Sequence, residues 1–177
     1  MSELERPIKS RALPSDAIVV EADTAERAAL AVRFELAEVA HLRAEVSLES
    51  DGNAVRASGT LQADVTQVCA VSAEEFAVNI AEEIAFRFIP ESETATLDHE
   101  AEGADIEVEL SDEDCDEITY SGDAFDLGEA IAQSLGLAID PYAEGPNADA
   151  AREKAGIVDE NAPSGPLAEA LMGLKKG

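Results

Sequence analysis

The feature that most constrains the fold is a two-residue alternation of apolar and polar side chains that starts at Leu42. Apolar residues at positions 42, 44, 46 and 48 alternate with charged or polar ones, and Asp51-Gly52-Asn53 separates this run from a second one at 55–58. A period of two is typical of a strand with one buried face, and a short turn of Asp, Gly and Asn between two such runs is typical of a hairpin. The sequence therefore predicts paired antiparallel strands here.

Two later runs extend the pattern. Residues 60–71 continue the alternation but lose phase at Gln67-Val68, which indicates a bulge or the end of a strand. The clearest strand follows at 76–88, where one apolar face is interrupted only at Glu82 and Pro90 ends the run. Residues 106–110 form one more candidate strand. The apolar positions of the clearest strand are Phe76, Val78, Ile80, Ile84, Phe86 and Phe88.

A capping pattern predicts the first helix. Asp23, followed three residues later by Glu26, has the form of a capping box, in which each side chain satisfies a backbone amide of the first turn. Apolar residues behind it recur at helical spacing, so a helix is expected over 24–40. The short apolar run at 17–20 is a candidate strand before it.

A second capping pattern predicts another helix. Asp126 and Glu129 repeat the capping-box form before an apolar run, which predicts a helix over 127–136. Gly136 is expected to be its C-terminal cap, because glycine readily takes the left-handed conformation that ends many helices. Pro141 then stops any continuation.

Together these elements predict an α+β fold. We expect an antiparallel β-sheet with two or three helices packed on it, a loosely ordered acidic loop and a C-terminal tail. The single domain would span 1–143. Residues 144–177, rich in small, polar, Gly and Pro residues, would form a flexible tail ending in a short amphipathic helix at 166–176.

Charge is the unusual property of the composition. The 177 residues include 39 acidic and 12 basic ones, a formal net charge of −27. Such a surface repels nucleic-acid backbones and attracts basic proteins, although solubility alone is an alternative explanation. Neither a signal peptide nor a long apolar segment is recognisable, so a cytoplasmic protein without a membrane span is expected.

The acidic stretch 111–123 raises the question of a metal site. Its aspartates match the first positions of a calcium-binding loop, but Glu117 stands where that loop needs glycine and Asp123 where it needs a bidentate glutamate. We therefore expect no specific metal site, and interpret the stretch as a recognition edge or a plain solvated loop. The candidate partner-binding residues are Asp112, Glu113, Asp114, Asp116, Glu117 and Asp126.

No catalytic or cofactor site is predicted. Cys69 and Cys115 are the only cysteines, too few for a four-thiolate zinc site, and the apolar surroundings of Cys69 favour an inert buried thiol. The sequence contains no phosphate-binding glycine-rich loop, and carboxylates are so abundant that no pair of them indicates acid–base catalysis. Rapid stoichiometric labelling of Cys69 would favour an enzyme.

Four segments, in their order and spacing, resemble the YceD family, which is named for accumulation of large-subunit ribosomal RNA. They are ADTAERAALAVRFELAEV, ASGTLQADVTQVCAVSAEEF, DAFDLGEAIAQSLGLAIDPY and PLAEALMGLKK. The chain departs from many members in having Ser72 where they have a second cysteine, and it has no C-terminal cysteine cluster. The residues that carry the resemblance include Gly59, Cys69, Asp126, Leu127, Leu135, Leu137 and Pro141.

The resemblance implies a non-enzymatic factor that supports accumulation, processing or stability of large-subunit (23S) ribosomal RNA. Two kinds of contact are compatible with the charge: the acidic surface holds a basic ribosomal protein or pre-ribosomal particle, or arginines of the N-terminal part touch RNA. Candidates for the second are Arg27, Arg33 and Arg43. An acidic nucleic-acid mimic that binds a basic enzyme is the alternative function. The oligomeric state stays open.

Overall fold

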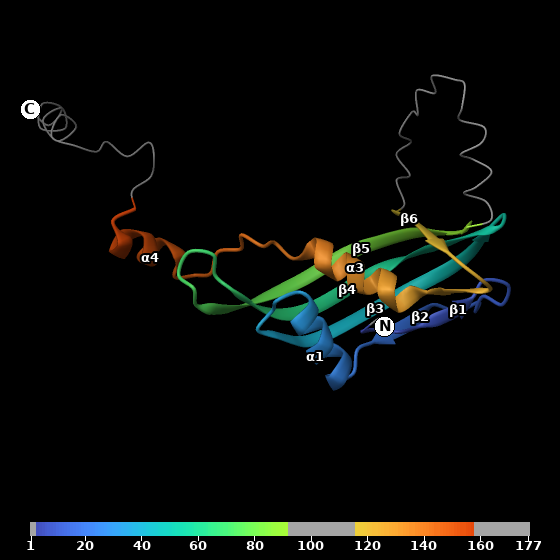
Figure 1. Cartoon of the computed structure of the whole chain (residues 1–177), viewed down its shortest axis with the longest axis horizontal. Helices are drawn as coiled ribbons and strands as arrows, with labels where there is room; N and C mark the ends of the chain where they lie inside the picture. Colours follow the sequence, from blue (N-terminus) through green and yellow to red (C-terminus); the bar gives the residue numbers. More distant parts are fainter. Residues whose placement is uncertain (1–2, 92–115, 158–177) are drawn as a thin grey trace, which may run out of the picture.

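The computed structural model describes residues 3–91 and 116–157 (Figure 1). The strand expected at 106–110, the helix expected at 166–176 and the carboxylates of Asp112, Glu113 and Asp114 lie outside the described residues. The described strands are β1 (Pro7–Lys9), β2 (Ile18–Glu21), β3 (Glu38–Asp51), β4 (Ala54–Val68), β5 (Glu75–Pro90), β6 (Asp116–Tyr120) and β7 (Ala124–Asp126). The described helices are α1 (Thr24–Arg33), α3 (Leu127–Ala138) and α4 (Ala148–Ala155).

The α+β fold predicted from the sequence is confirmed. A five-stranded sheet has the order β2-β3-β4-β5-β6, and β1 and β7 form a separate two-stranded sheet. All neighbours are antiparallel except β5 and β6, which run parallel. A parallel pair needs a long connection, and residues 91–115 join these two strands. Among the described strands, this parallel pair is the exception to the antiparallel pairing that the sequence predicted.

The predicted hairpin is confirmed and is longer than the alternation alone indicated. β3 and β4 pair from Asp51–Ala54 at the turn to Glu38–Thr66 at the far end. Gly52 takes a φ of 65° in the turn, a left-handed conformation that glycine adopts without steric cost. A register shift between Val39 and His41 allows β3 to continue past the end of the regular alternation.

Of the two interpretations of Gln67-Val68, the strand end is confirmed. β4 pairs regularly with β5 up to the pair Val68–Glu75, so the loss of phase there marks the end of β4 and not a bulge. A bulge lies on β3 instead, between Val39 and His41. Apolar residues alternate regularly from Leu42, after this bulge.

The first helix begins as predicted and ends earlier. The capping box is complete: Asp23 Oδ1 accepts from the amides of Ala25 (2.7 Å) and Glu26 (2.9 Å), and Glu26 Oε2 accepts from the amide of Asp23 (2.8 Å). The predicted end at residue 40 is wrong, because α1 stops at Arg33 and the chain turns sharply through Glu35, whose φ is 54°. Residues 38–40 belong to β3 instead, where sheet pairing overrides helical spacing.

The second helix begins at Leu127, as predicted, but Gly136 is not its cap. α3 continues to Ala138, and Gly136 lies inside it, facing Phe34. A Cβ at this position would lie 2.6 Å from the nearest ring atom of Phe34. Gly136 therefore lets the segment after α1 pack closely against α3, which the sequence pattern alone could not indicate.

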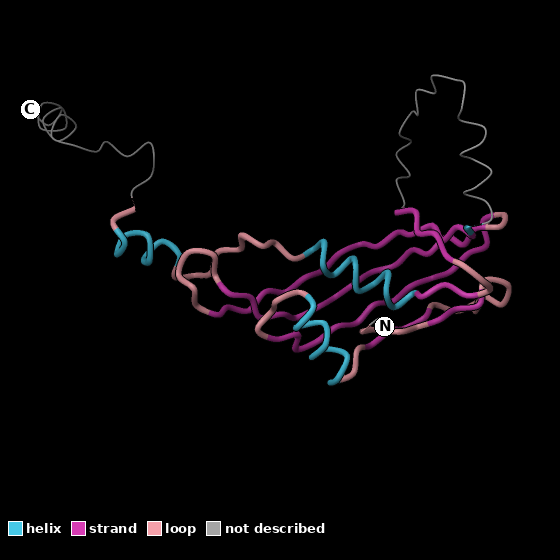
Figure 2. The backbone as a smooth tube through the Cα atoms, viewed as in Figure 1, coloured by secondary structure: helices cyan, strands magenta, loops and turns pink. Residues whose placement is uncertain are grey.

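The core lies between one face of the large sheet and the helices α1 and α3, which Figure 2 shows along the same side of it. The opposite face of the sheet carries polar side chains such as Arg43, Glu45, Thr60 and Gln62, as the alternation predicts. An aromatic cluster joins the two sheets: Phe125 of β7 stacks on Phe88 of β5, with ring centroids 4.1 Å apart. The largest side chains that are almost fully buried include Leu4, Leu30, Leu42, Leu61, Phe86, Phe88, Leu127, Ile131 and Leu135.

Beyond residue 143 the structure contains α4, which the sequence analysis did not anticipate. Ala148, at its first position, is buried, and Asn147 Nδ2 donates to Glu74 Oε2 over 2.7 Å. The Gly145 backbone lies against Phe76 and Cys69. These contacts link the start of the expected tail to the far end of the sheet, and the division at 143 stays a prediction.

Candidate functional site

The described part of the acidic stretch lies at the start of β6. Asp116 is exposed and pairs through its backbone with Phe86 of β5. The Glu117 carboxylate accepts from Arg87 over 3.0 Å, and Arg87 also donates to Asp51 over 3.2 Å. These two carboxylates, Glu117 first, raise the pKa of Arg87 above its ordinary value. Glu117 is therefore an internally paired charge, whereas Asp116 is open to a partner.

Asp126 has the contacts of a helix cap. Its Oδ1 accepts from the amides of Gly128 (3.0 Å) and Glu129 (3.2 Å), and also from the amide of Arg6 (2.8 Å). A carboxylate with three amide donors at a helix start stabilises the helix and fixes the crossing N-terminal segment. Its role as a partner contact stays a prediction, and we leave Asp126 out of the proposed recognition surface.

Most residues of the family pattern are structural. Leu127 and Leu135 are fully buried, and Gly59 allows a close approach of β4 to the backbone of β3. Leu137 differs from them, because its side chain is 81% exposed at the end of α3. Pro141 follows α3 on the surface, where it cannot continue the helix. Packing in the core therefore does not explain Leu137.

Cys69 lies buried in a turn directly after β4. Its Sγ accepts from the amides of Ser72 (3.3 Å) and Val71 (3.4 Å), and the turn is closed by a bond from the Ala73 amide to the Cys69 carbonyl oxygen (3.0 Å). Hydrogen bonds from the side chain and then the backbone of Ser72 lower the pKa of the Cys69 thiol to about 7. The turn thus shields the sulfur while favouring its thiolate form.

This arrangement predicts a pH dependence of stability. Because the folded pKa of Cys69 lies below the ordinary thiol value of 9.0, ionisation of Cys69 adds stability that is fully present above about pH 9 and is lost as the pH falls through about 7. In a Cys115→Ser background, thiolate absorbance of the folded protein should titrate near pH 7. Ser72→Ala should move the midpoint upward, and an unshifted midpoint near 9 in the parent would contradict the assignment.

The three arginines considered for RNA contact are already engaged. Arg27 donates to the Ala22 carbonyl oxygen (2.7 Å), and Arg43 donates to Glu45 (3.2 Å). Arg33 donates to Glu129 and to Glu3, each over 2.7 Å, and so ties α1 to α3 and to the N-terminal segment. Arg27 and Arg33 lie on α1 and Arg43 on β3, so contact of all three with RNA stays a prediction.

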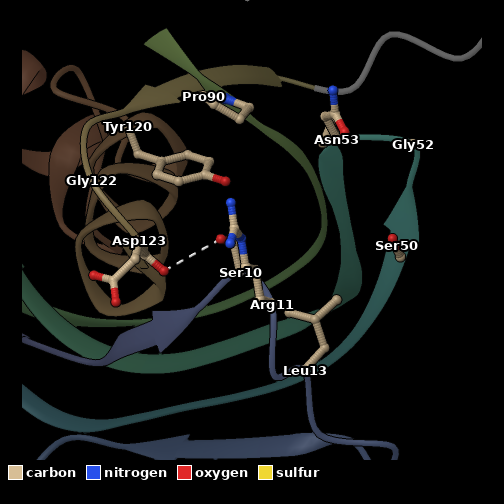
Figure 3. Close-up of a pocket in the computed structure, with 11 residues that line it drawn as sticks. Ser10, Arg11, Leu13, Ser50, Gly52, Asn53, Pro90, Tyr120, Gly122 and Asp123 are labelled. Atoms are coloured by element: carbon tan, nitrogen blue, oxygen red, sulfur yellow. Dashed lines mark hydrogen bonds between the residues drawn. The ribbon is translucent and has the colours of Figure 1, made fainter. Parts of the chain in front are cut away.

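A polar cleft that the sequence analysis missed lies where β1, the β3–β4 turn and the β6–β7 turn meet. It has a volume of about 860 Å³. Figure 3 shows Arg11 extending toward Tyr120 and the hydrogen bond from Ser10 to the Asp123 carbonyl oxygen. Its polar lining consists of the guanidinium of Arg11, the Asp123 residue, and hydroxyl and amide groups. It is lined by Ser10, Arg11, Leu13, Ser50, Gly52, Asn53, Ala54, Pro90, Tyr120, Gly122 and Asp123.

No group of three or more His, Cys, Asp or Glu side chains in residues 3–91 and 116–157 could hold a metal ion. No helix within those ranges is long and apolar enough to cross a membrane. Among the described residues, none that lines the polar cleft is His, Cys or Lys, the side chains that most often act as bases or nucleophiles.

Comparison with known proteins gives one match. The family model described as "Large ribosomal RNA subunit accumulation protein YceD" matches residues 57–166, a range that includes most of β4 and all of β5, the Cys69 turn, α3 and α4. No curated protein and no solved structure is significantly similar to the chain. The match covers more than half of the 177 residues and confirms the resemblance seen in the sequence. The chain therefore belongs to the YceD family.

Proposed function

We propose that the chain is a non-enzymatic factor that supports accumulation of 23S ribosomal RNA by binding a basic ribosomal protein, or a pre-ribosomal particle that carries one, through its acidic surface. The family is named for a role in large ribosomal RNA subunit accumulation and not for a reaction, which supports the general role. Such a factor would act where ribosomes are assembled, in the cytoplasm.

The main observation that favours a protein partner over RNA is that most arginines are engaged within the chain. Six of its eight arginines form ion pairs with carboxylates of the same chain, and Arg27 donates a hydrogen bond to a backbone carbonyl oxygen. Binding RNA phosphates requires cationic side chains that are available to release counterions from the nucleic acid. The pairs are Arg6–Glu26, Arg33–Glu3, Arg33–Glu129, Arg43–Glu45, Arg56–Asp51, Arg87–Asp51, Arg87–Glu117, Arg152–Glu144 and Arg152–Asp149.

Because most arginines are paired within the chain, the remaining unpaired charge is predominantly that of the 39 acidic residues. The net charge of −27 attracts cationic proteins over long range and speeds their capture, especially at low ionic strength. Basic ribosomal proteins carry the opposite charge and must be kept from binding RNA unspecifically during assembly. An acidic chain of this kind could hold them without competing for the RNA itself.

The proposal is tested by a pull-down from cell lysate with the tagged full-length chain, at low and moderate salt, with and without ribonuclease. We expect recovery of one basic large-subunit protein or of large-subunit precursors that survives ribonuclease and weakens with salt. Loss on ribonuclease treatment alone would overturn the protein contact in favour of RNA. Recovery of a nucleic-acid-binding enzyme instead would favour the mimic.

A further inference from the structure

One edge of β5 is only partly covered. β4 pairs with one side of β5 along most of its length, whereas β6 pairs with the other side only from Phe86 to Pro90. Over 75–85 no other strand of the described part of the chain pairs with that second side. An unpaired strand edge presents a row of backbone donors and acceptors that another strand can join.

A groove runs between this edge and the C-terminal half of α3. It has a volume of about 250 Å³ and is lined by Glu82 and Ile84 of β5, Asp116 of β6, and Ser134 and Leu137 of α3, among others. Figure 1 shows α3 lying across the face of the sheet close to β5. A groove between an open strand edge and a helix accommodates an extended peptide as an added strand.

The charge of the groove favours one kind of occupant. Glu82, Glu83 and Asp116 are all exposed and all negative, and none of the described residues that line the groove is basic. Glu82 stands where the apolar face of β5 should continue, an inward-facing charge of the kind that hinders a strand from pairing with a like-charged copy of itself. Two β5 edges would therefore repel each other, whereas a cationic strand would be attracted.

The apolar side of the groove adds a second requirement. Leu137 is 81% exposed on α3, while on the opposite face of β5 the small side chains of Ala77, Ala81 and Ala85 leave room for the side chains of a neighbour. Successive side chains of an added strand point to opposite faces of the sheet. A segment that alternates apolar and basic residues could place its Lys or Arg side chains on the α3 side, with their aliphatic stems against Leu137 and their charges near Glu82, and its apolar side chains on the opposite face against the alanines.

We propose that an extended segment of a protein partner, with alternating apolar and Lys or Arg side chains, binds along β5 over 75–85 as an additional strand. This inference rests on the proposed function, because it names the type of segment that the basic partner would present. It adds to the acidic attraction a set of backbone hydrogen bonds that charge alone does not supply.

The test uses labelled peptides of alternating lysine and valine, titrated against the full chain by fluorescence anisotropy. Two versions carry N-methyl groups on alternate residues, one in each phase. Since alternate amides of a strand face opposite edges, we expect one phase to weaken binding about tenfold or more, through lost hydrogen bonds, and the other to bind like the parent. Equal binding of both methylated peptides and the parent would overturn strand addition.

Variants of the chain locate the site. Glu82→Gln and Leu137→Ala replace exposed side chains, and each should weaken binding of the unmethylated peptide several-fold. Glu21→Gln is the matched control, because it removes an exposed carboxylate from β2 at the opposite edge of the sheet. If all three variants bind alike, the groove is not the site. Dimerisation of the free chain that competes with the peptide would also overturn the proposal, by placing a second copy there.

The two proposals fail in different ways. If the lysate pull-down recovers a basic protein equally well with the wild type, Glu82→Gln and Leu137→Ala, the groove is excluded and the proposed function stands. If the wild type recovers no basic protein or particle, the proposed function fails, whatever the peptides show.

Discussion

Replacing Phe125 with alanine is expected to destabilise the protein by about 4 kcal/mol, the usual cost of removing a buried aromatic side chain. Phe125 is 2% exposed, and its ring stacks on Phe88 and lies 5.7 Å, centroid to centroid, from Tyr120. Its strand pairs with β1, so this ring joins the two-stranded sheet to the core of the five-stranded one. The substitution would leave a cavity at that junction.

Equilibrium unfolding in urea measures this loss. Phe125→Leu keeps most of the volume and should cost much less. Tyr142→Ala, which removes a 79% exposed ring, should change the free energy of unfolding by no more than about 0.5 kcal/mol. A cost for Phe125→Ala close to that of Tyr142→Ala would contradict the packing described here.

Gly59→Ala is expected to destabilise the protein by about 3 kcal/mol, because the added methyl group has no room. A Cβ at position 59 would lie 2.0 Å from the Glu45 carbonyl oxygen and 2.8 Å from the Val46 Cα. Both are backbone atoms of the paired strand β3, so relief requires the two strands to move apart and to weaken their hydrogen bonds.

The matched control for this variant is Gly52→Ala in the β3–β4 turn. A Cβ there would meet nothing within 4 Å, but the positive φ disfavours alanine, so we expect a cost of about 1 kcal/mol from backbone strain. Urea unfolding of both variants separates steric contact from conformational strain. A smaller loss for Gly59→Ala than for Gly52→Ala would show that β3 and β4 are not in the close approach described.

The sequence predicted those parts of the fold that local rules determine. The alternation from Leu42, the turn at Gly52 and the acceptor side chains of Asp23 and Asp126 act through neighbours along the chain, and each produced the expected element. Where contacts between distant segments determine the structure, the predictions failed. The first helix ends at Arg33, and residues that continue its helical spacing belong to β3 instead. Gly136 lies inside α3 because the Phe34 ring, from the segment after α1, packs closely against it.

The candidate site shows the same division. The interruption of an apolar face at Glu82 was visible in the sequence, but its position beside α3 depends on the order of strands, which no local pattern specifies. The cleft at Arg11 and Tyr120 likewise brings together three turns that are distant along the chain. For Asp126, sequence indicated both a cap and an acidic contact, and only the structure shows how its carboxylate is used.

The central claim is that an acidic surface holds a basic large-subunit partner, and the most direct measurement compares the wild type with one variant in the ribonuclease-treated pull-down. In that variant Asp112, Asp114 and Asp116 are replaced by asparagine, which removes three negative charges with little change in side-chain shape and keeps the Arg87–Glu117 ion pair. At low salt, we expect the variant to recover several-fold less of the basic partner than the wild type does. Equal recovery by the two proteins would contradict it.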